Sequence, residues 1–449
     1  MQSLALAKTT PLTRDSIFDG IVLYEPVDAA LLEKCIHCDL LVDNYGDPKW
    51  FHNEKAHLEK YSANINKNFA RVEYSRSNGF GIGRFNPVGS LGLHSIRRQT
   101  RHTLVNGLMR DIDIENAHNQ LLVQLLKHNE YQGEYDMLMD YCDNRDDWRN
   151  EIMNAYDLKN NKYAKKQPTD TSYASPKEIA KNLIIRILYG GNVNEWIKAY
   201  DIKGGDCPTN IQSLVTQLKN IQIWVCKNNP ELYELCKKKN WEKKKDYNHR
   251  GTTTSWLLQE KECIVLETMY KFLVEKEIIQ NDVCVLCNDG IMVEDKYYYP
   301  ELLNELNVAV FNETGFNLKF VEKPLTEGYE NIIDDHLIFN LWKQEITDGL
   351  YAEYFKLLYY RDFCYKYGFL YTYNGVYWKK DENKKCLQLS SRIDKQFKEH
   401  IIKKSFDVRK QLVCDKEDYK ANKFFDRKEK KIDNGAVLDM LKRKWGMLL

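Results

Sequence analysis

The stretch MRDIDIENAHNQLL, residues 109–122, sets two carboxylates two positions apart within an apolar run. If this run is a strand, Asp111 and Asp113 share one face, because side chains alternate along a strand. A buried carboxylate without a partner is costly, so that face must lie near solvent or meet a cation. The residues that follow have apolar side chains at helical spacing, which predicts a helix that turns back over a sheet.

A further carboxylate is predicted at the tip of a hairpin. Residues 283–294, VCVLCNDGIMVE, combine a buried strand, an Asn-Asp-Gly turn that contains Asp289, and a second strand. Taken alone, these residues are typical of any tight turn, because they tolerate a left-handed backbone. Together with Asp111 and Asp113 they supply carboxylates from two strands, as two metal ions about 3.5–4 Å apart require in phosphoryl transfer. The alternative is a surface acidic pair that caps the next helix.

A helix with clear start and stop signals is predicted in SPKEIAKNLIIRILYGG, residues 175–191. Ser175 is a good cap, Pro176 suits the first helical position, and Glu178 completes a capping box. The two glycines at the end predict a helix stop.

One stripe of this helix has a composition that suits a nucleotide. Residues four apart lie on one face of a helix, and here they are Lys177, Lys181, Ile185 and Tyr189. Lysine binds phosphate as a compact point charge, so the stripe would hold a triphosphate, with the tyrosine at the sugar or base. The alternative is an amphipathic surface helix with solvated lysines.

The order of the three segments resembles motifs A, B and C of the DNA polymerase I superfamily. The residues that match the spacing of motif B are Lys177, Lys181, Tyr189 and Gly190. Motif C usually has His-Asp, and Asn288-Asp289 departs from it but keeps the aspartate. The segment DIDIENAH further resembles the transposon–virus polymerases (TV-Pol). These are relatives of DNA polymerase I and of single-subunit phage RNA polymerases, encoded by virophages and related mobile elements.

The resemblance covers roughly residues 71–300 and implies an α+β, right-hand polymerase fold. It predicts an antiparallel palm sheet with helical fingers across residues 71–330, and an N-terminal region, residues 1–70, as a reduced thumb. In residues 335–449, FLYTYNGVYWKKD resembles the segment that precedes the helicase module of poxvirus-type primase–helicases. No GxxxxGK[ST] phosphate loop occurs in the chain. The resemblance implies that the C-terminal accessory segment is a connector toward a superfamily 3 helicase domain, which is either absent or part of a longer chain.

The resemblance also implies roles for single residues. Asp113 and Asp289 would hold two Mg²⁺ ions, or Mn²⁺, with Asp111 in support, and Lys181 would stabilise the charge of the triphosphate. Asp113 is preferred to Asp111 because the superfamily's sugar-screening residue comes five places later, here at His118. The other predicted nucleotide contacts are Lys177, Tyr189 and Gly190, and the predicted nucleic-acid contacts are Arg84, Arg97, Arg98, Arg101, Gln259 and Trp241.

Charge restricts where nucleic acid would bind. The 66 basic and 65 acidic residues leave a net charge of +1, so binding depends on local patches rather than on the whole molecule. Trp241 lies in one such patch, KKKNWEKKKDYNHR at residues 237–250, where aromatic side chains interrupt a run of cations. The alternative for this patch is a solvated charge run.

Cysteine use and hydropathy indicate the compartment. The twelve cysteines have no framework spacing, and no apolar stretch is long enough for a signal peptide or a membrane span. We therefore expect an intracellular protein that is not secreted, and the resemblance to polymerases of viruses and mobile elements implies the host-cell cytoplasm. The pairs Cys35/Cys38 and Cys284/Cys287 would form a zinc site only if they met, and ordinary buried thiols are the preferred interpretation.

The predicted function is template-directed nucleotidyl transfer, by a DNA polymerase, a primase or both, on primer–template DNA with nucleoside triphosphates. Two other classes fit parts of the pattern. A metal-dependent nuclease would use the same aspartates but has no need of the lysine helix. A non-catalytic nucleic-acid-binding module that positions a helicase would need neither the aspartates nor the lysine helix for catalysis.

Overall fold

The computed structural model describes residues 15–37, 54–76, 81–160, 175–245, 247–326 and 328, and the stretches 354–355, 358–359, 362–366, 369–373, 378–393 and 395–397. The chain divides into two compact units. The first comprises residues 1–29 and 43–328, and the second comprises residues 30–42 and 329–449. Part of the predicted C-terminal connector, residues 398–449, lies outside the described residues, as does Cys38.

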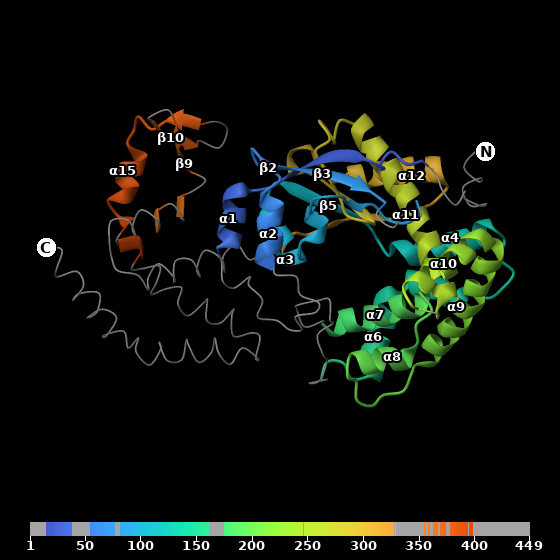
Figure 1. Ribbon diagram of the computed structural model, residues 1–449. Coiled ribbons are helices and arrows are strands. Elements are labelled where there is room, and N and C mark those ends of the chain that lie inside the picture. Colours follow the sequence, from blue (N-terminus) through green and yellow to red (C-terminus); the bar gives the residue numbers. More distant parts are fainter. Residues whose placement is uncertain are drawn as a thin grey trace. The chain divides into compact units, whose positions relative to one another are not determined.

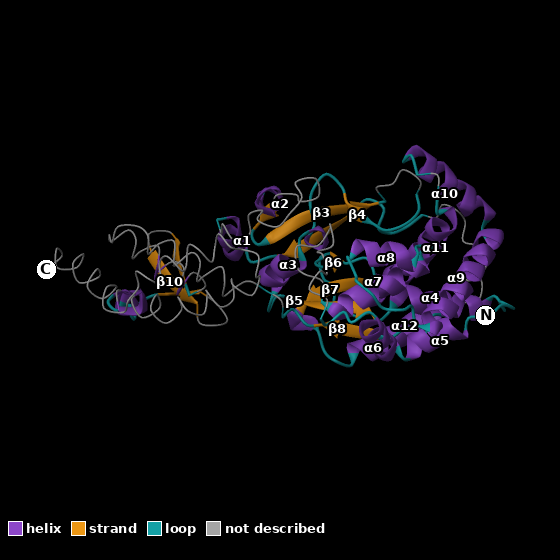
Figure 2. Cartoon of the chain, turned by 90° about the horizontal axis from the view of Figure 1, so that it is seen from below, coloured by secondary structure: helices purple, strands orange, loops and turns teal. Residues whose placement is uncertain are grey.

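Asp111 and Asp113 belong to a four-stranded antiparallel sheet of the first unit, whose strand β5 (Met109–Ile114) is labelled in Figure 1. The strands of this sheet are β5, β6 (Val285–Leu286), β7 (Gly290–Glu294) and β8 (Phe320–Lys323), in the order β6-β7-β5-β8. Figure 2 shows β7, β5 and β8 side by side. The predicted acidic strand and the predicted hairpin are both confirmed as elements, and they are neighbours. That this sheet is a polymerase palm stays a prediction.

A second antiparallel sheet contains residues from the predicted N-terminal region. Strand β3 (Phe69–Ser75) pairs with β1 (Ile21–Pro26), β2 (Ile65–Asn66) and β4 (Asn86–Pro87). All six residues of β1 pair with β3, so the N-terminal region supplies a strand to the first unit. Its role as a thumb stays a prediction.

Helices surround the two sheets of the first unit. Those before the lysine helix are α2 (Glu54–Ser62), α3 (Arg98–Val105), α4 (Ala117–His128), α5 (Asp136–Asp143) and α6 (Arg145–Ala155). The lysine helix and those after it are α7 (Pro176–Leu188), α8 (Val193–Ala199), α9 (Thr209–Asn228), α10 (Pro230–Glu242), α11 (His249–Glu275) and α12 (Leu302–Thr314). Helices α9, α10 and α11 pack on one another in a group (Figure 1).

The second unit is described in part. Strands β9 (Phe363–Lys366), β10 (Phe369–Tyr373) and β11 (Trp378–Lys380) form an antiparallel sheet in the order β11-β10-β9. Helix α15 (Lys385–Ser390) follows in sequence. Helix α1 (Ala29–Ile36) begins at the boundary of the two units.

The capping box predicted for the lysine helix is present. The Ser175 hydroxyl accepts a hydrogen bond from the Glu178 amide at 3.2 Å, and the Glu178 carboxylate accepts one from the Ser175 amide at 3.1 Å. The long helix α11 begins at His249, directly after Asn248, whose φ of 55° is left-handed. The hydroxyls of the three threonines near its start donate to carbonyls one turn earlier, as threonine does within helices.

Glu25 of β1 is a fully buried carboxyl group of the first unit. Its oxygens accept hydrogen bonds from the Tyr74 hydroxyl at 2.5 Å, the Tyr61 hydroxyl at 3.1 Å and the Leu93 amide at 2.7 Å. Burial raises the pKa of Glu25 from 4.5 to about 7, although these hydrogen bonds lower it. The folded state therefore holds this proton more tightly than the unfolded state does.

Between pH 4.5 and about 7 the stability contributed by Glu25 should fall as pH rises, because the unfolded chain releases the proton first. The loss should reach about 3 kcal/mol, at roughly 1.4 kcal/mol per pKa unit. Glu25→Gln keeps an acceptor for Leu93 and Tyr61, so its urea-unfolding free energy should be flatter across this range. Equal pH dependence of the two proteins would contradict the assignment.

Candidate functional site

Three aspartates gather where strand β5 meets the tip of the β6–β7 hairpin. Asp113 lies opposite Gly290 in the β5–β7 register, and the Ile114 amide donates to the Asp289 carbonyl at 3.1 Å. Asp111, two residues earlier, lies opposite Met292. The carboxylates of Asp111 and Asp113 are about 5% and 6% exposed, respectively, and Asp289 is half-buried.

The electrostatics of this group are those of crowded negative charge. The pKa of Asp113 is raised from 3.8 to about 7, first by burial and then by the neighbouring Asp289, while Lys323 has the opposing effect. Burial also raises the pKa of Asp111, with Asp289 again adding to the shift. The three carboxylates therefore act on one another, and a cation placed among them would be strongly attracted.

A lysine that the sequence analysis did not predict supplies such a cation. Lys323, the last residue of β8, lies opposite Asp111 in the sheet, and its ammonium group forms an ion pair with the Asp113 carboxylate. Burial would lower the pKa of Lys323, but Asp113 and Asp289 raise it overall. In the sequence Lys323 is one lysine of a polar strand end, and only strand pairing brings it to the carboxylates.

The residues present fit a hard divalent cation. Within the described ranges, no three or more His, Cys, Asp or Glu side chains are arranged to hold an ion by themselves. Mg²⁺ is usually bound by one or two carboxylates, with waters and substrate phosphates completing its shell, and Asp113 and Asp289 offer that donor set. The ammonium group of Lys323 already stands where positive charge is favoured. A metal role for the three aspartates stays a prediction.

Gly290 allows the hairpin to approach β5. A Cβ atom at this position would lie 2.4 Å from the Ile112 carbonyl oxygen and 3.1 Å from the Asp113 carboxylate. Gly290→Ala should therefore push the hairpin away from β5, at about 1–3 kcal/mol of unfolding free energy. If the site catalyses a reaction, a displacement near 1 Å should lower its rate about a hundredfold. Met292→Leu, a volume-conserving change on the same strand, is the control, and Gly290→Ala behaving like it would contradict the prediction.

Helix α7 carries Lys181 within the electrostatic reach of Asp289, and its Lys177 pairs with a neighbouring helix. Partial burial lowers the pKa of Lys181, with smaller contributions from Lys323 and Arg149, while Asp289 opposes them. Lys181 thus belongs to the same electrostatic cluster as Asp289. Lys177 is 57% exposed and pairs with Asp146 of α6 at 3.1 Å.

A buried hydrogen-bond network next to this cluster joins α4, the end of α7, α11 and the segment of Arg84. The His118 ring on α4 contacts the Tyr189 hydroxyl at the end of α7 through Nδ1 and the Glu262 carboxylate on α11 through Nε2 at 2.5 Å. Glu262 also accepts two hydrogen bonds from the Arg84 guanidinium, at 2.7 and 2.9 Å. This hydrogen-bond network therefore brings together His118, Tyr189 and Arg84, which were predicted as separate contacts from the sequence.

Glu262 is the central residue of this hydrogen-bond network, and no feature of the sequence predicted it as a site residue. It is 0% exposed, so burial raises its pKa, yet the hydrogen bonds and charges of His118 and Arg84 lower it overall. Burial would lower the pKa of Arg84, but Glu262 raises it overall. In the sequence Glu262 belongs to the polar run Gln259 to Glu262, which is typical of a solvated helix face, and its burial follows from packing alone.

Gly190 ends α7 against the start of α11. Its φ of 76° is left-handed, and a Cβ atom there would lie 2.4 Å from the Asn248 side-chain oxygen. The Asn248 amide nitrogen donates to the Tyr189 carbonyl at 2.9 Å, and a Cβ atom on Gly251 would meet that carbonyl at 2.0 Å. This close packing positions the Tyr189 ring toward His118.

Of the remaining predicted nucleic-acid contacts, some lie beside the aspartate cluster and others lie away from it. Arg98 and Arg101 of α3 lower the pKa of Asp111, so they lie on its side of the cluster, and Arg97 is the N-cap of α3. Gln259 lies one turn before Glu262 and donates to the Ser255 hydroxyl at 3.1 Å. Trp241 lies at the end of α10, is 74% exposed, and is not part of the carboxylate cluster.

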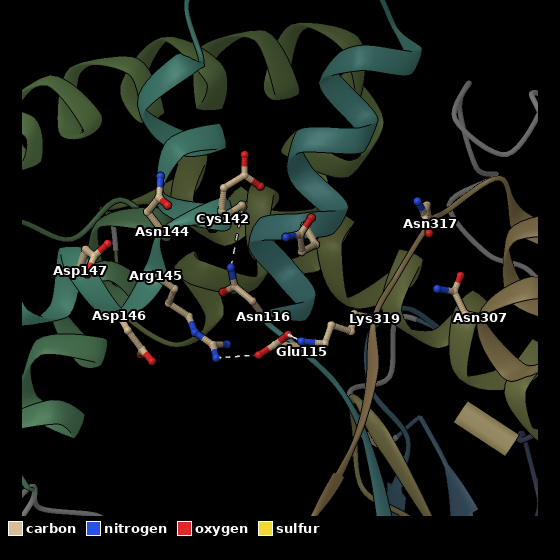
Figure 3. A pocket seen from close by; sticks show the side chains of 12 residues that line it. Glu115, Asn116, Cys142, Asn144, Arg145, Asp146, Asp147, Asn307, Asn317 and Lys319 are labelled. Atoms are coloured by element: carbon tan, nitrogen blue, oxygen red, sulfur yellow. Dashed lines mark hydrogen bonds and ion pairs between the residues drawn. The ribbon is translucent and has the colours of Figure 1, made fainter. Parts of the chain in front are cut away.

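A polar cavity of about 570 Å³ opens beyond the end of β5. Figure 3 shows Arg145 and Lys319 reaching Glu115 from opposite sides, each at 2.8 Å. The residues that line it are Glu115, Asn116, Gln120, Cys142, Asp143, Asn144, Arg145, Asp146, Asp147, Asn307, Asn317 and Lys319. Because Asp146 also holds Lys177, the cavity adjoins the α6–α7 side of the site without including the three aspartates.

Comparison with known proteins gives one partial match and no family. No protein-family model matches the chain. Over 267 residues the chain is 25% identical to a protein of Sputnik virophage named "Putative helicase V13". The match covers 57% of this chain and 30% of the virophage protein, so the chain spans less than a third of that relative. In the described ranges no helix is long and apolar enough to cross a bilayer.

Proposed function

We propose that the chain carries out template-directed nucleotidyl transfer, as a DNA polymerase, a primase or both, in the replication of a virus or mobile element. The observation that carries this proposal is that Asp113 of β5 and Asp289 of the hairpin turn interact electrostatically, with Lys181 of a capped helix within the electrostatic reach of Asp289. A nuclease needs the carboxylates alone, whereas transfer from a nucleoside triphosphate also uses a cation that holds the phosphates.

In this proposal each group of residues has a defined part. Asp113 and Asp289, with Asp111 in support, would hold two Mg²⁺ ions, which supply charge neutralisation at the triphosphate and acidify the attacking hydroxyl. Lys181 would bind the phosphates, with Lys177 released from Asp146 as a second contact. Tyr189, fixed by Gly190 and hydrogen-bonded to His118, would pack against the nucleoside.

The nucleic acid would lie along the basic and polar residues around this centre. Arg98 and Arg101 act on Asp111, where guanidinium groups suit phosphate, and Arg97 precedes them as the N-cap of α3. Arg84 and Gln259 lie near Glu262 and would contact the primer–template. The virophage relative is named a helicase and is more than three times as long as the matched segment, which supports a helicase domain in the same longer protein. The setting would be the replication site in the host-cell cytoplasm, and the finer family would be TV-Pol.

Lys181→Ala should lower primer extension about a hundredfold or more, the usual effect of removing one group that stabilises transition-state charge. The assay contains the chain, Mg²⁺, a primed template and four deoxynucleotides. A parallel reaction without primer and with ribonucleotides reports primase activity. Lys198→Ala on α8, which removes an exposed lysine paired with Glu195, is the matched control.

The same assay separates the alternatives. Shortening of the labelled strand without nucleotide addition would indicate a nuclease. Binding of the strand without either reaction would indicate the module that positions a helicase, which the name of the virophage relative favours. Either result would overturn the proposed function.

A further inference from the structure

The corner between α10 and α11 exposes two aromatic rings. Trp241 is 74% exposed and Tyr247 is 66% exposed, which makes them the two most exposed large hydrophobic side chains in the described part of the chain. An apolar ring held in water is unfavourable, so such rings often mark a binding surface. Both belong to the basic-aromatic stretch at residues 237–250.

Five exposed cations flank the two rings in the sequence, beside one exposed acid, Glu242. The cations are Lys238, Lys243, Lys244, Lys245 and Arg250. None of these five forms an ion pair with another described residue, so their charge is available to a ligand. Lysine is depleted in the cores of protein–protein interfaces, whereas lysine with aromatic rings is the usual composition of single-strand binding surfaces.

A buried asparagine makes hydrogen bonds to both sides of the corner. Asn240, which is 7% exposed, donates toward the Tyr247 carbonyl at 3.3 Å and the Thr252 hydroxyl at 3.2 Å. The Lys245 amide in turn donates to the Asn240 carbonyl at 2.8 Å. These hydrogen bonds connect the end of α10, which carries Trp241, to Tyr247 and to the start of α11.

The corner adjoins the candidate site. Asn248, the residue before α11, donates to the Tyr189 carbonyl at the end of α7. From Arg250 to Glu262 the helix α11 rises about 18 Å, at 1.5 Å per residue. A strand that passes Tyr189 would therefore reach the corner within a few nucleotides.

We propose that this corner binds a single strand of nucleic acid, with unpaired bases stacked on Trp241 and Tyr247 and the lysines on its phosphates. Only unpaired bases expose both ring faces, so the surface selects single strands over duplex. That the strand is the template beside the site rests on the proposed function, but the binding does not.

The test is the anisotropy of a fluorescently labelled oligothymidylate, measured with the full chain and without metal or nucleotides. Trp241→Ala should weaken binding about fivefold or more, since stacking contributes roughly 1–3 kcal/mol per base. Tyr247→Ala should act similarly, and Trp241→Phe should keep most of the affinity. Replacing Lys243, Lys244 and Lys245 by alanine should reduce the slope of log Kd against log salt by about 2.

Phe311→Ala on α12, which removes another exposed ring, is the control and should leave the Kd unchanged. The proposal is overturned if Trp241→Ala and Tyr247→Ala leave the Kd within twofold, or if they weaken binding to a blunt duplex equally. If the parent chain does not extend primers but these variants lose strand binding, the surface is supported and the polymerase is rejected. If the parent chain extends primers but the variants bind the strand as before, the polymerase is supported and the surface is rejected.

Discussion

Asp113→Asn and Asp289→Asn should each lower primer extension at least about a thousandfold. A bound metal ion contributes several kcal/mol to the stabilisation of transition-state charge, and each 1.36 kcal/mol corresponds to a factor of ten. Asparagine keeps the volume of the side chain but removes the negative charge that would hold the ion. The measurement is the single-turnover rate of nucleotide addition at saturating Mg²⁺.

The stability of Asp113→Asn should stay the same or rise, although its activity falls. Because burial and Asp289 raise the pKa of Asp113 to about 7, the ionised carboxylate is unfavourable in the fold above that pH. Asp113→Asn should therefore unfold at the same or a higher urea concentration at pH 8, with loss of the Lys323 pair as the opposing effect. This separates a lost catalytic group from a damaged fold.

Asp295→Asn is the matched control for the two variants. Asp295 follows β7 directly and pairs with Arg110, away from the hairpin tip. Its substitution should leave extension within about twofold, as expected for a surface position. Full activity of Asp113→Asn or of Asp289→Asn would reject the assignment of the site.

Glu262→Ala should destabilise the fold by about 3–5 kcal/mol, the usual effect of removing one partner from a buried ion pair. The variant leaves the Arg84 guanidinium without its bidentate acceptor and the His118 ring without the carboxylate at 2.5 Å. The urea-unfolding free energy measures the loss. Glu275→Ala, at the exposed end of the same helix, should change it by no more than about 0.5 kcal/mol.

The milder Glu262→Gln tests positioning rather than folding. It keeps one acceptor and the side-chain volume, so the chain should fold, but it removes the charge that orients His118. If His118 and Tyr189 act at the sugar, the KM for the incoming nucleotide should rise more than the turnover rate falls. Unfolding and KM values equal to those of the parent chain would show that Glu262 does not organise the site.

Local elements were predictable because their signals lie within a few residues. Ser175 and Glu178 specify the start of α7, the turn around Asp289 specifies the hairpin, and the alternation from Asp111 to Asp113 specifies one face of β5. Each depends on backbone geometry and on neighbours along the chain.

Tertiary structure alone decided which charged groups meet. Lys323 reaches Asp113, 210 positions earlier in the sequence, because β8 pairs with β5. Glu262 is buried because α11 packs between α4 and the segment of Arg84. A lysine or glutamate in a polar run has the same sequence signature whether it is solvated or paired. The sequence by itself therefore determined the strands, the hairpin and the capped helix, whereas long-range pairing determined the cation at Asp113 and the buried carboxylate that joins Arg84, His118 and Tyr189.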